Sequence, residues 1–177
     1  IPAKKTLDAY IKKGIVKVLD CKITNTPHLK AYTHCLYNMH DRTDWIAYID
    51  IDEFIVLKKH HDIHSFLKDY DDYAGVCLNW VIYTANNHIS KPEGLVMQNY
   101  TEPTPDDFSP NRHVKSIVHP AGVNTICSSH YPQYADDYYG VNEKYVFVPQ
   151  AWSDFSNEVA QINHYFTKSF EEWLEKI

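Results

Sequence analysis

The segment from Trp45 to Leu57, WIAYIDIDEFIVL, places three carboxylates inside an otherwise apolar run. A run that is apolar on both alternating faces is typical of a strand buried in the middle of a sheet, most often a parallel one. On an extended chain, side chains two residues apart point the same way, with their Cα atoms roughly 7 Å apart. We therefore expect Asp50 and Asp52 to aim two negative charges at one spot where this strand ends.

Two like charges held this close raise each other's pKa and destabilise the fold unless a cation lies between them. A divalent metal ion, which prefers hard oxygen ligands, would satisfy that requirement. The alternative is an ordinary acidic turn after a strand, because short Asp-x-Asp motifs also arise by chance. The apolar neighbours Ile49 and Phe54 favour the metal site over the surface turn.

The bulk properties indicate one globular domain over residues 1–177, with 44% hydrophobic residues and a net charge of -6. The negative charge and the lack of a basic stripe argue against a nucleic-acid partner. No apolar run approaches the length of a membrane span, so we expect no transmembrane segment. Four separate cysteines (Cys21, Cys35, Cys77 and Cys127) suit a reducing compartment, although four also suffice for two disulfides.

Helical and strand patterns alternate along the chain, which predicts an α/β domain with a mixed sheet. Helices are predicted over residues 6–13, 27–40, 62–69 and 168–177. Strands are predicted over 15–19, 74–83, 114–118, 145–148 and 161–165, and a strand pair over 45–57 carries the acidic turn. The Pro-rich stretch 84–111 predicts a long loop of the functional or mobile kind.

Two further groups of polar residues are candidates for chemistry. The His-His-x-x-His pattern of His60, His61 and His64 has a spacing that can bind zinc, but we expect an exposed helix start instead. Paired acids at 71–72, 106–107 and 136–137 are expected to lie in solvated turns, from which one could supply a general base.

Several blocks in a fixed order resemble glycosyltransferase family 92 and the related family-2-like bacterial enzymes. One such block would be weak, but five in sequence are fairly specific. The blocks are AYTHCL (31–36), WIAYIDIDEF (45–54), Trp80 with PEGLV (92–96), VKSIVHP (114–120) followed by His130, and INHYFTKSFEEWLEKI (162–177). The resemblance covers nearly the whole chain.

The resemblance implies a metal-dependent, inverting transfer of a sugar from a nucleotide-sugar donor to a saccharide or glycoconjugate acceptor. It implies that Mn²⁺ or Mg²⁺ neutralises the donor diphosphate as the glycosidic bond breaks. The metal ligands implied are Asp50, Asp52 and His164. The substrate-binding candidates are Trp80, Lys115 and Lys168, and the catalytic candidates are Glu53, Glu93 and His130. Each lysine is equally readily a solvated side chain, and a Trp at a strand end is as often a core residue.

The same resemblance implies a GT-A-like, Rossmann-related fold, in which a mixed β-sheet is flanked by helices. GT-A enzymes begin with a strand and an acidic loop that hold the nucleotide, whereas this chain starts near the following helix, TLDAYIKKG. We therefore expect a fragment without the first nucleotide-binding strand. The chain also departs from the family after Trp80, where it has VIYT in place of a Phe-Gly-Ser type sequence. The compartment expected is the cytoplasm, at a membrane in a bacterium, or the Golgi lumen in a eukaryote.

Two other functions remain open from the sequence. A haloacid-dehalogenase-like phosphohydrolase also places Asp-x-Asp after a buried strand, with the first Asp as nucleophile and Mg²⁺ beside it. That pattern has Thr or Val four residues after the first Asp, where this chain has Phe54. A non-catalytic carbohydrate-binding fragment is the other alternative, because 14 Tyr and 4 Trp suit sugar stacking without chemistry.

Overall fold

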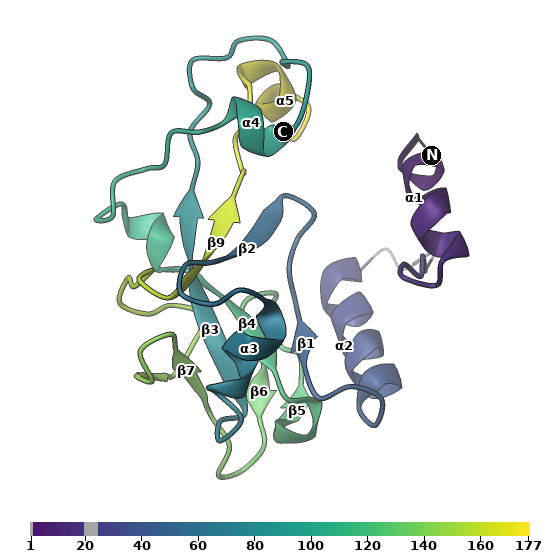
Figure 1. The fold of residues 1–177 in the computed structure, drawn as a ribbon, viewed down its shortest axis with the longest axis vertical. Helices are drawn as coiled ribbons and strands as arrows, with labels where there is room; N and C mark the ends of the chain where they lie inside the picture. The colour runs from purple at the N-terminus through teal and green to yellow at the C-terminus, as the bar shows by residue number, and fades with distance from the viewer. Residues whose placement is uncertain (1, 20–24) are drawn as a thin grey trace.

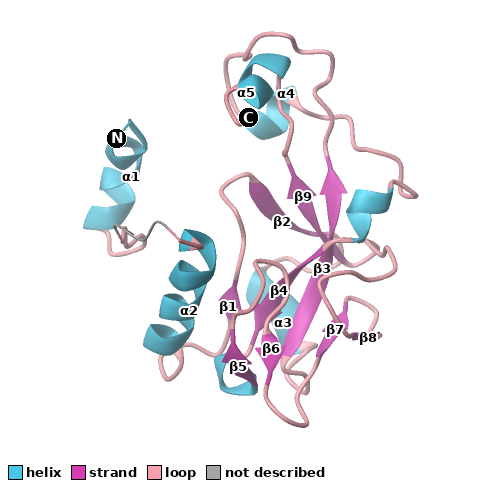
Figure 2. Ribbon diagram, turned by 180° about the vertical axis from the view of Figure 1, so that it is seen from behind, coloured by secondary structure: helices cyan, strands magenta, loops and turns pink. Residues whose placement is uncertain are grey.

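The computed structural model of the protein describes residues 2–19 and 25–177. A twisted mixed sheet lies at the centre, and helix α3 (Ile63–Lys68) covers one of its faces (Figure 1). Phe66 and Leu67 of this helix pack on Val76, Leu78 and Ile117 of the sheet. On the other side, helix α2 (Pro27–Met39) lies beside the short strands β1 (Ile46–Ala47) and β5 (Val123–Thr125), as Figure 2 shows from behind.

The sheet combines antiparallel and parallel pairs. Its strands run in the order β1, β4 (Val114–Val118), β3 (Gly75–Ile82), β7 (Gly140–Asn142) and β8 (Phe147–Val148). Beyond this path, β3 also pairs in parallel with β9 (Ala160–His164), and β9 pairs antiparallel with β2 (Glu53–Leu57). A separate two-stranded sheet joins β5 and β6 (Gln133–Tyr134). These elements confirm the predicted α/β class with a mixed sheet.

The expectation of a strand buried in the middle of a parallel sheet is wrong, whereas the predicted strand pair around the acidic turn is confirmed. Its first part, β1, is a two-residue strand at the sheet edge that pairs antiparallel with β4, and its second part, β2, pairs antiparallel with β9. The run is broken because the chain turns at residues 50–53, where the Glu53 N–H donates to the Asp50 carbonyl at 3.1 Å. Ile51 at the tip of this turn is 96% exposed, so the apolar run is not buried throughout.

Most of the other predicted elements are confirmed. Helix α1 (Pro2–Lys12), α2, α3, β3, β4, β8 and β9 lie close to their predicted ranges, and α5 (Phe170–Leu174) lies within 168–177. The 84–111 loop is long, as expected, and contains only the short helix α4 (Val96–Asn99) and the start of the 3-10 helix η1 (Ser109–Arg112). Strands β5, β6 and β7 and the 3-10 helix η2 (Pro120–Gly122) were not predicted, because each is only two or three residues long.

The predicted strand at 15–19 is wrong. These residues follow α1 without strand structure, and Ile15, Val18 and Leu19 are exposed. A β-prone run becomes a strand only where a neighbouring strand supplies hydrogen-bond partners, and this segment pairs with none of the described strands. Cys21 lies outside the described residues, while Cys35, Cys77 and Cys127 carry free thiols, which contradicts two disulfides. No described helix is both long and apolar enough to cross a bilayer.

A buried carboxylate fixes the start of β9. The side chain of Glu143, which follows β7, accepts hydrogen bonds from the backbone N–H groups of Glu158, Val159 and Ala160 at 2.7, 2.5 and 2.6 Å. It also accepts the Ser156 hydroxyl at 2.6 Å. Since backbone donors buried without partners are costly, this carboxylate holds the strand that carries His164 in register.

We predict that Glu143→Gln lowers the free energy of unfolding by about 3 kcal/mol, because an amide cannot accept all four donors and adds an N–H among them. Urea unfolding followed by circular dichroism measures the loss. The matched control is Glu158→Gln, which removes an exposed partner of Lys144 and leaves the backbone donor in place, so its midpoint should match the wild type. Equal midpoints for all three proteins would contradict the role of Glu143.

Candidate active site

The strand registers bring the acidic turn to the ends of β9 and β4. Glu53 stands opposite His164 in the antiparallel β2–β9 pair, and the N–H of Tyr165 extends this pairing to the carbonyl of Asp52 at 2.9 Å. On the other side, β1 runs along β4, with Ala47 opposite Ile117, so the chain reaches Asp50 beside Lys115. The turn is therefore positioned from both sides by backbone pairing.

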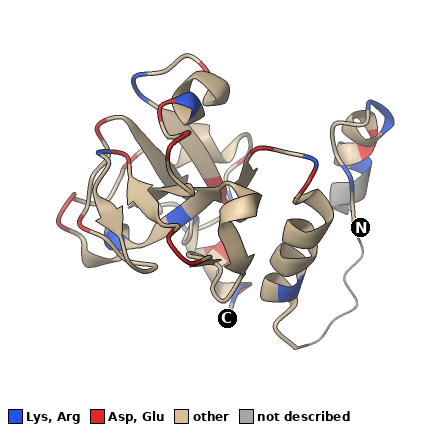
Figure 3. Cartoon of the chain, turned by 90° about the horizontal axis from the view of Figure 1, so that it is seen from below, with Lys and Arg blue, Asp and Glu red and all other residues tan. Residues whose placement is uncertain are grey.

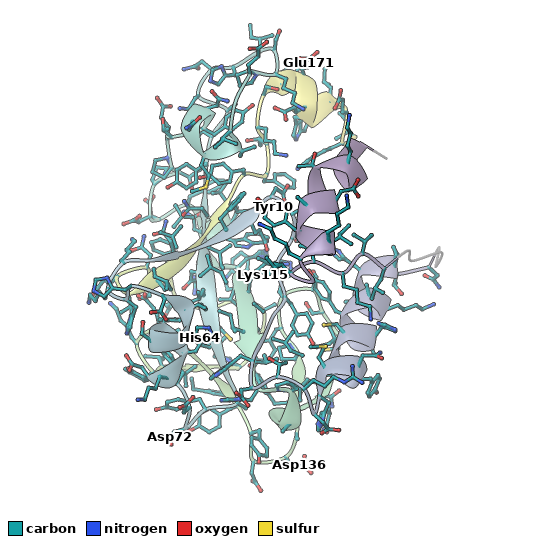
Figure 4. The ribbon with its side chains drawn as sticks, turned by 45° about the vertical axis from the view of Figure 1, so that its right-hand side comes forward. Tyr10, His64, Asp72, Lys115, Asp136 and Glu171 are labelled. Carbon is teal, nitrogen blue, oxygen red and sulfur yellow. The ribbon has the colours of Figure 1, made fainter. Side chains whose placement is uncertain are left out.

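Lys115 lies on β4, near the middle of the molecule in Figure 4, and its side chain is fully buried. Its Nζ donates to Asp50 Oδ2 at 3.0 Å and to the Ser129 carbonyl at 3.0 Å, and it lies 3.4 Å from Glu53 Oε2. Glu53 Oε2 also accepts the Asp50 N–H at 2.8 Å. One ammonium thus compensates two carboxylates, since unpaired buried charges would destabilise the fold.

Both carboxylate oxygens of Asp50 have partners within the protein. In addition to Lys115 on Oδ2, its Oδ1 accepts the Tyr32 hydroxyl at 3.0 Å and lies 2.9 Å from His28 Nε2, both on α2. Burial raises the pKa of Asp50, but Lys115, Tyr32 and His28 together lower it below its usual value. Burial raises the pKa of Glu53 above its usual value, against the lowering influence of the Asp50 N–H and Lys115.

Asp52 faces a different set of groups. Its Oδ1 lies 3.9 Å from His164 Nε2, while its Oδ2 accepts a hydrogen bond from Lys176 Nζ at 2.9 Å. Lys176 also donates to the Phe166 carbonyl at 2.7 Å, which ties the end of the chain after α5 to this carboxylate. Burial lowers the pKa of His164 to about 4, against the raising influence of Asp52 and Asp50, so its imidazole is neutral at pH 7.

The pair of Asp52 and His164 has the chemistry of a metal site. Among the described residues, no three His, Cys, Asp or Glu side chains gather as ready-made metal ligands. Two ligands bound to one ion at about 2.1 Å each can lie up to about 4.2 Å apart. The 3.9 Å between Asp52 Oδ1 and His164 Nε2 falls within that span, and a neutral imidazole is the form that binds metals. This donor set therefore fits a cation.

Comparison with known proteins decides the family. The sequence model of glycosyltransferase family 92 matches residues 2–177. The chain belongs to glycosyltransferase family 92. Membership supports a glycosyltransferase activity, with a sugar donor and an acceptor, and the mixed α/β architecture is compatible with a GT-A-like fold. A search of the curated proteins finds no match to this chain.

In this family 92 chain, Trp80 lies between three histidines. Its ring centroid is 4.3 Å from that of His164 and 5.0 Å from those of His113 and His130. Burial lowers the pKa of His113 to about 4, and burial followed by the charge of Lys115 lowers the pKa of His130. Both imidazoles are therefore neutral at pH 7, and His130 is able to accept a proton.

The remaining predicted site residues lie further from the turn. Lys168 adopts a left-handed backbone with φ 53° and lines the same pocket as Trp80 and His164. Glu93 is exposed in the loop after β3, and within the described part of the chain no hydrogen bond or ion pair joins its carboxylate to the acidic turn. The histidines of the His-His-x-x-His pattern lie around the start of α3, away from the acidic turn. The Nε2 atom of His60 lies 2.9 Å from Oδ2 of Asp69, the residue that follows α3.

The structure adds three residues that the sequence did not single out for the site: His28, Tyr32 and Lys176. Tyr32 lies on the inner stripe of α2, and its buried hydroxyl required a partner, which was a usable signal. His28 and Lys176 gave no such signal, because their partners lie 22 and 124 residues away along the chain.

We predict that Lys115→Met lowers the free energy of unfolding by about 3 kcal/mol, because it leaves the buried carboxylate of Glu53 without a cation and removes one partner of the half-buried Asp50. Urea unfolding measures this loss. The control, Lys144→Met, removes the exposed ion pair with Glu158 and should leave the midpoint unchanged.

A double variant distinguishes the loss of charge compensation from a general disruption of packing around residue 115. Lys115→Met combined with Glu53→Gln removes one charge of each sign, so we expect it to be more stable than Lys115→Met alone. If the double variant were less stable by the sum of the two single losses, Lys115 would not be compensating Glu53.

Proposed function

We propose that this family 92 chain transfers a sugar from a nucleotide-sugar donor to a saccharide acceptor, with a divalent cation held by Asp52 and His164. The observation that carries the proposal is the β2–β9 register, which sets Asp52 Oδ1 3.9 Å from His164 Nε2. Mn²⁺ or Mg²⁺ bound there would neutralise the diphosphate leaving group of the donor. Sites that bind a metal–diphosphate complex use one or two carboxylates and leave other positions to phosphate oxygens and water. A site with only two protein ligands is therefore sufficient.

Lys176 supports the same placement of the donor. Its Nζ donates to Asp52 Oδ2, whereas Oδ1 of the same carboxylate faces His164. Lys176 can therefore stay in place when a cation binds to Oδ1. Its ammonium adds positive charge next to where a diphosphate would lie. Asp50, by contrast, has both oxygens engaged, so we assign it to holding the turn rather than to the metal.

His130 is the base we propose for an inverting displacement. Its imidazole meets the Trp80 ring edge to face, and burial lowers its pKa, so the unprotonated ring can accept the proton of an acceptor hydroxyl. Glu53 is less suited, because its carboxylate faces the Asp50 N–H and Lys115. The phosphohydrolase alternative is also disfavoured: it needs Asp50 as a free nucleophile, whereas Lys115, Tyr32 and His28 occupy both its oxygens.

We predict that Asp52→Asn weakens Mn²⁺ binding in the presence of uridine diphosphate by roughly tenfold or more, because the amide brings no negative charge to the cation. Electron paramagnetic resonance of free Mn²⁺ measures the dissociation constant, and circular dichroism checks that the fold is intact. Asp72→Asn is the control, since Asp72 is an exposed acid in the loop after α3, at the lower edge of the molecule and away from Lys115 in Figure 4. Equal affinities of the Asp52 variant and the wild type would sink the metal assignment.

A further inference from the structure

The molecule contains a pocket of about 660 Å³ directly beside the acidic turn. Residues at the carboxyl ends of the parallel strands β3 and β9, on α5 and in the loop at 104–110 line it. In Figure 1, α5 lies beyond the ends of these two strands. His164 belongs both to its wall and to the pair with Asp52, so this one side chain joins the pocket to the acidic turn. Six aromatic residues line it: Trp80, Tyr83, Phe108, Phe166, Phe170 and Trp173.

Three of the hydroxyl groups in this wall, those of Thr84, Thr104 and Ser169, already have hydrogen-bond partners within the protein. Thr104 Oγ1 donates to the Ile82 carbonyl at 3.0 Å, and Ser169 Oγ donates to Glu172 at 2.9 Å. The backbone N–H of Asn86 donates a hydrogen bond to Thr84 Oγ1 at 3.3 Å. Although several polar residues line the pocket, the surface that the wall presents to it is almost entirely apolar.

Such a lining selects the chemistry of the ligand. A sugar ring carries hydroxyl groups around its edge, and each one buried without a partner loses its hydrogen bonds to water. An alkyl or aromatic group loses nothing of this kind and gains from leaving water. Phe108, Phe166 and Phe170, which also line the pocket, have exposed rings. An apolar ligand bound there would remove this apolar surface from water.

We propose that this pocket binds a hydrophobic aglycone, the alkyl or aryl group attached to the acceptor sugar. The sugar itself then lies at the mouth, beside His164, while its apolar substituent reaches between Trp80 and α5. Lys168 is the one Lys, Arg, Asp or Glu among the lining residues, and the other side chains of the wall suit an uncharged group. This assignment rests on the proposed function, because an acceptor is defined only for a sugar transfer.

Binding of simple glycosides tests the assignment without donor or metal. Octyl, phenyl and methyl β-glucosides share one sugar and differ only in the aglycone, and calorimetry measures their affinities below the micelle concentration of the octyl compound. We expect octyl or phenyl glucoside to bind roughly tenfold more tightly than methyl glucoside. The comparison of the octyl and phenyl arms distinguishes a lipid-like from an aromatic aglycone. Equal affinities for all three would overturn the proposal.

Variants place the binding in this pocket. Phe170→Ala and Phe108→Ala each remove an exposed ring of the pocket and should weaken octyl glucoside binding severalfold without unfolding the chain. Tyr37→Ala is the matched control, since Tyr37 is an exposed aromatic residue on α2, outside the pocket. If Tyr37→Ala weakens binding as much as the Phe variants, the glucoside is bound non-specifically and the proposal fails.

The outcome is separable from that of the manganese experiment. Loss of Mn²⁺ binding in Asp52→Asn together with equal affinities for the three glucosides would leave the proposed transferase standing and remove only the aglycone pocket. Preference for the octyl or phenyl compound together with unchanged Mn²⁺ binding in Asp52→Asn would remove the proposed metal site and, with it, the role of the pocket in acceptor binding.

Discussion

The buried ammonium of Lys115 is the interaction on which the geometry of the site depends. It lies between Asp50 and Glu53, at 3.0 and 3.4 Å from their nearest oxygens, with the Ser129 carbonyl as its third partner. Because a buried charge is tolerated only when it is paired and hydrogen-bonded, none of the three side chains can change its position alone. The turn at 50–53 is therefore tied to β4 by charge and to β9 by the backbone. In Figure 3, most of the other Lys and Arg residues are spread over loops and helices, mixed with acidic residues.

This arrangement gives the two aspartates different partners. Asp50 points toward Lys115 and the side chains of α2, whereas Asp52 lies beside His164 and Lys176. The sequence pattern led us to expect two carboxylates aimed at one spot, as on a continuous strand, but the chain turns between them. The repulsion that would have required a metal between them is relieved in part by a lysine. What is left for a cation is the pair of Asp52 and His164, which belongs to the proposed function.

Local patterns in the sequence were sufficient for most of the elements. The helix predicted over 27–40 is α2, and the strand predicted over 74–83 is β3. The strand predicted at 15–19 failed because strand formation depends on a partner elsewhere in the chain. For the same reason, nothing near Lys115 in the sequence indicated that it is buried against a turn 65 residues earlier. The family resemblance placed Asp52 and His164 in one site, but their register required the structure.

The separate roles of Asp50 and Asp52 are tested most directly by a crystal of the chain grown with Mn²⁺ and uridine diphosphate. Anomalous scattering locates manganese independently of any assumption about its ligands. The predicted result is a peak about 2.1–2.3 Å from an Asp52 oxygen and from His164 Nε2, with Lys115 still bound to Asp50. A peak on Asp50 with Lys115 displaced, or manganese bound away from both Asp52 and His164, would contradict it.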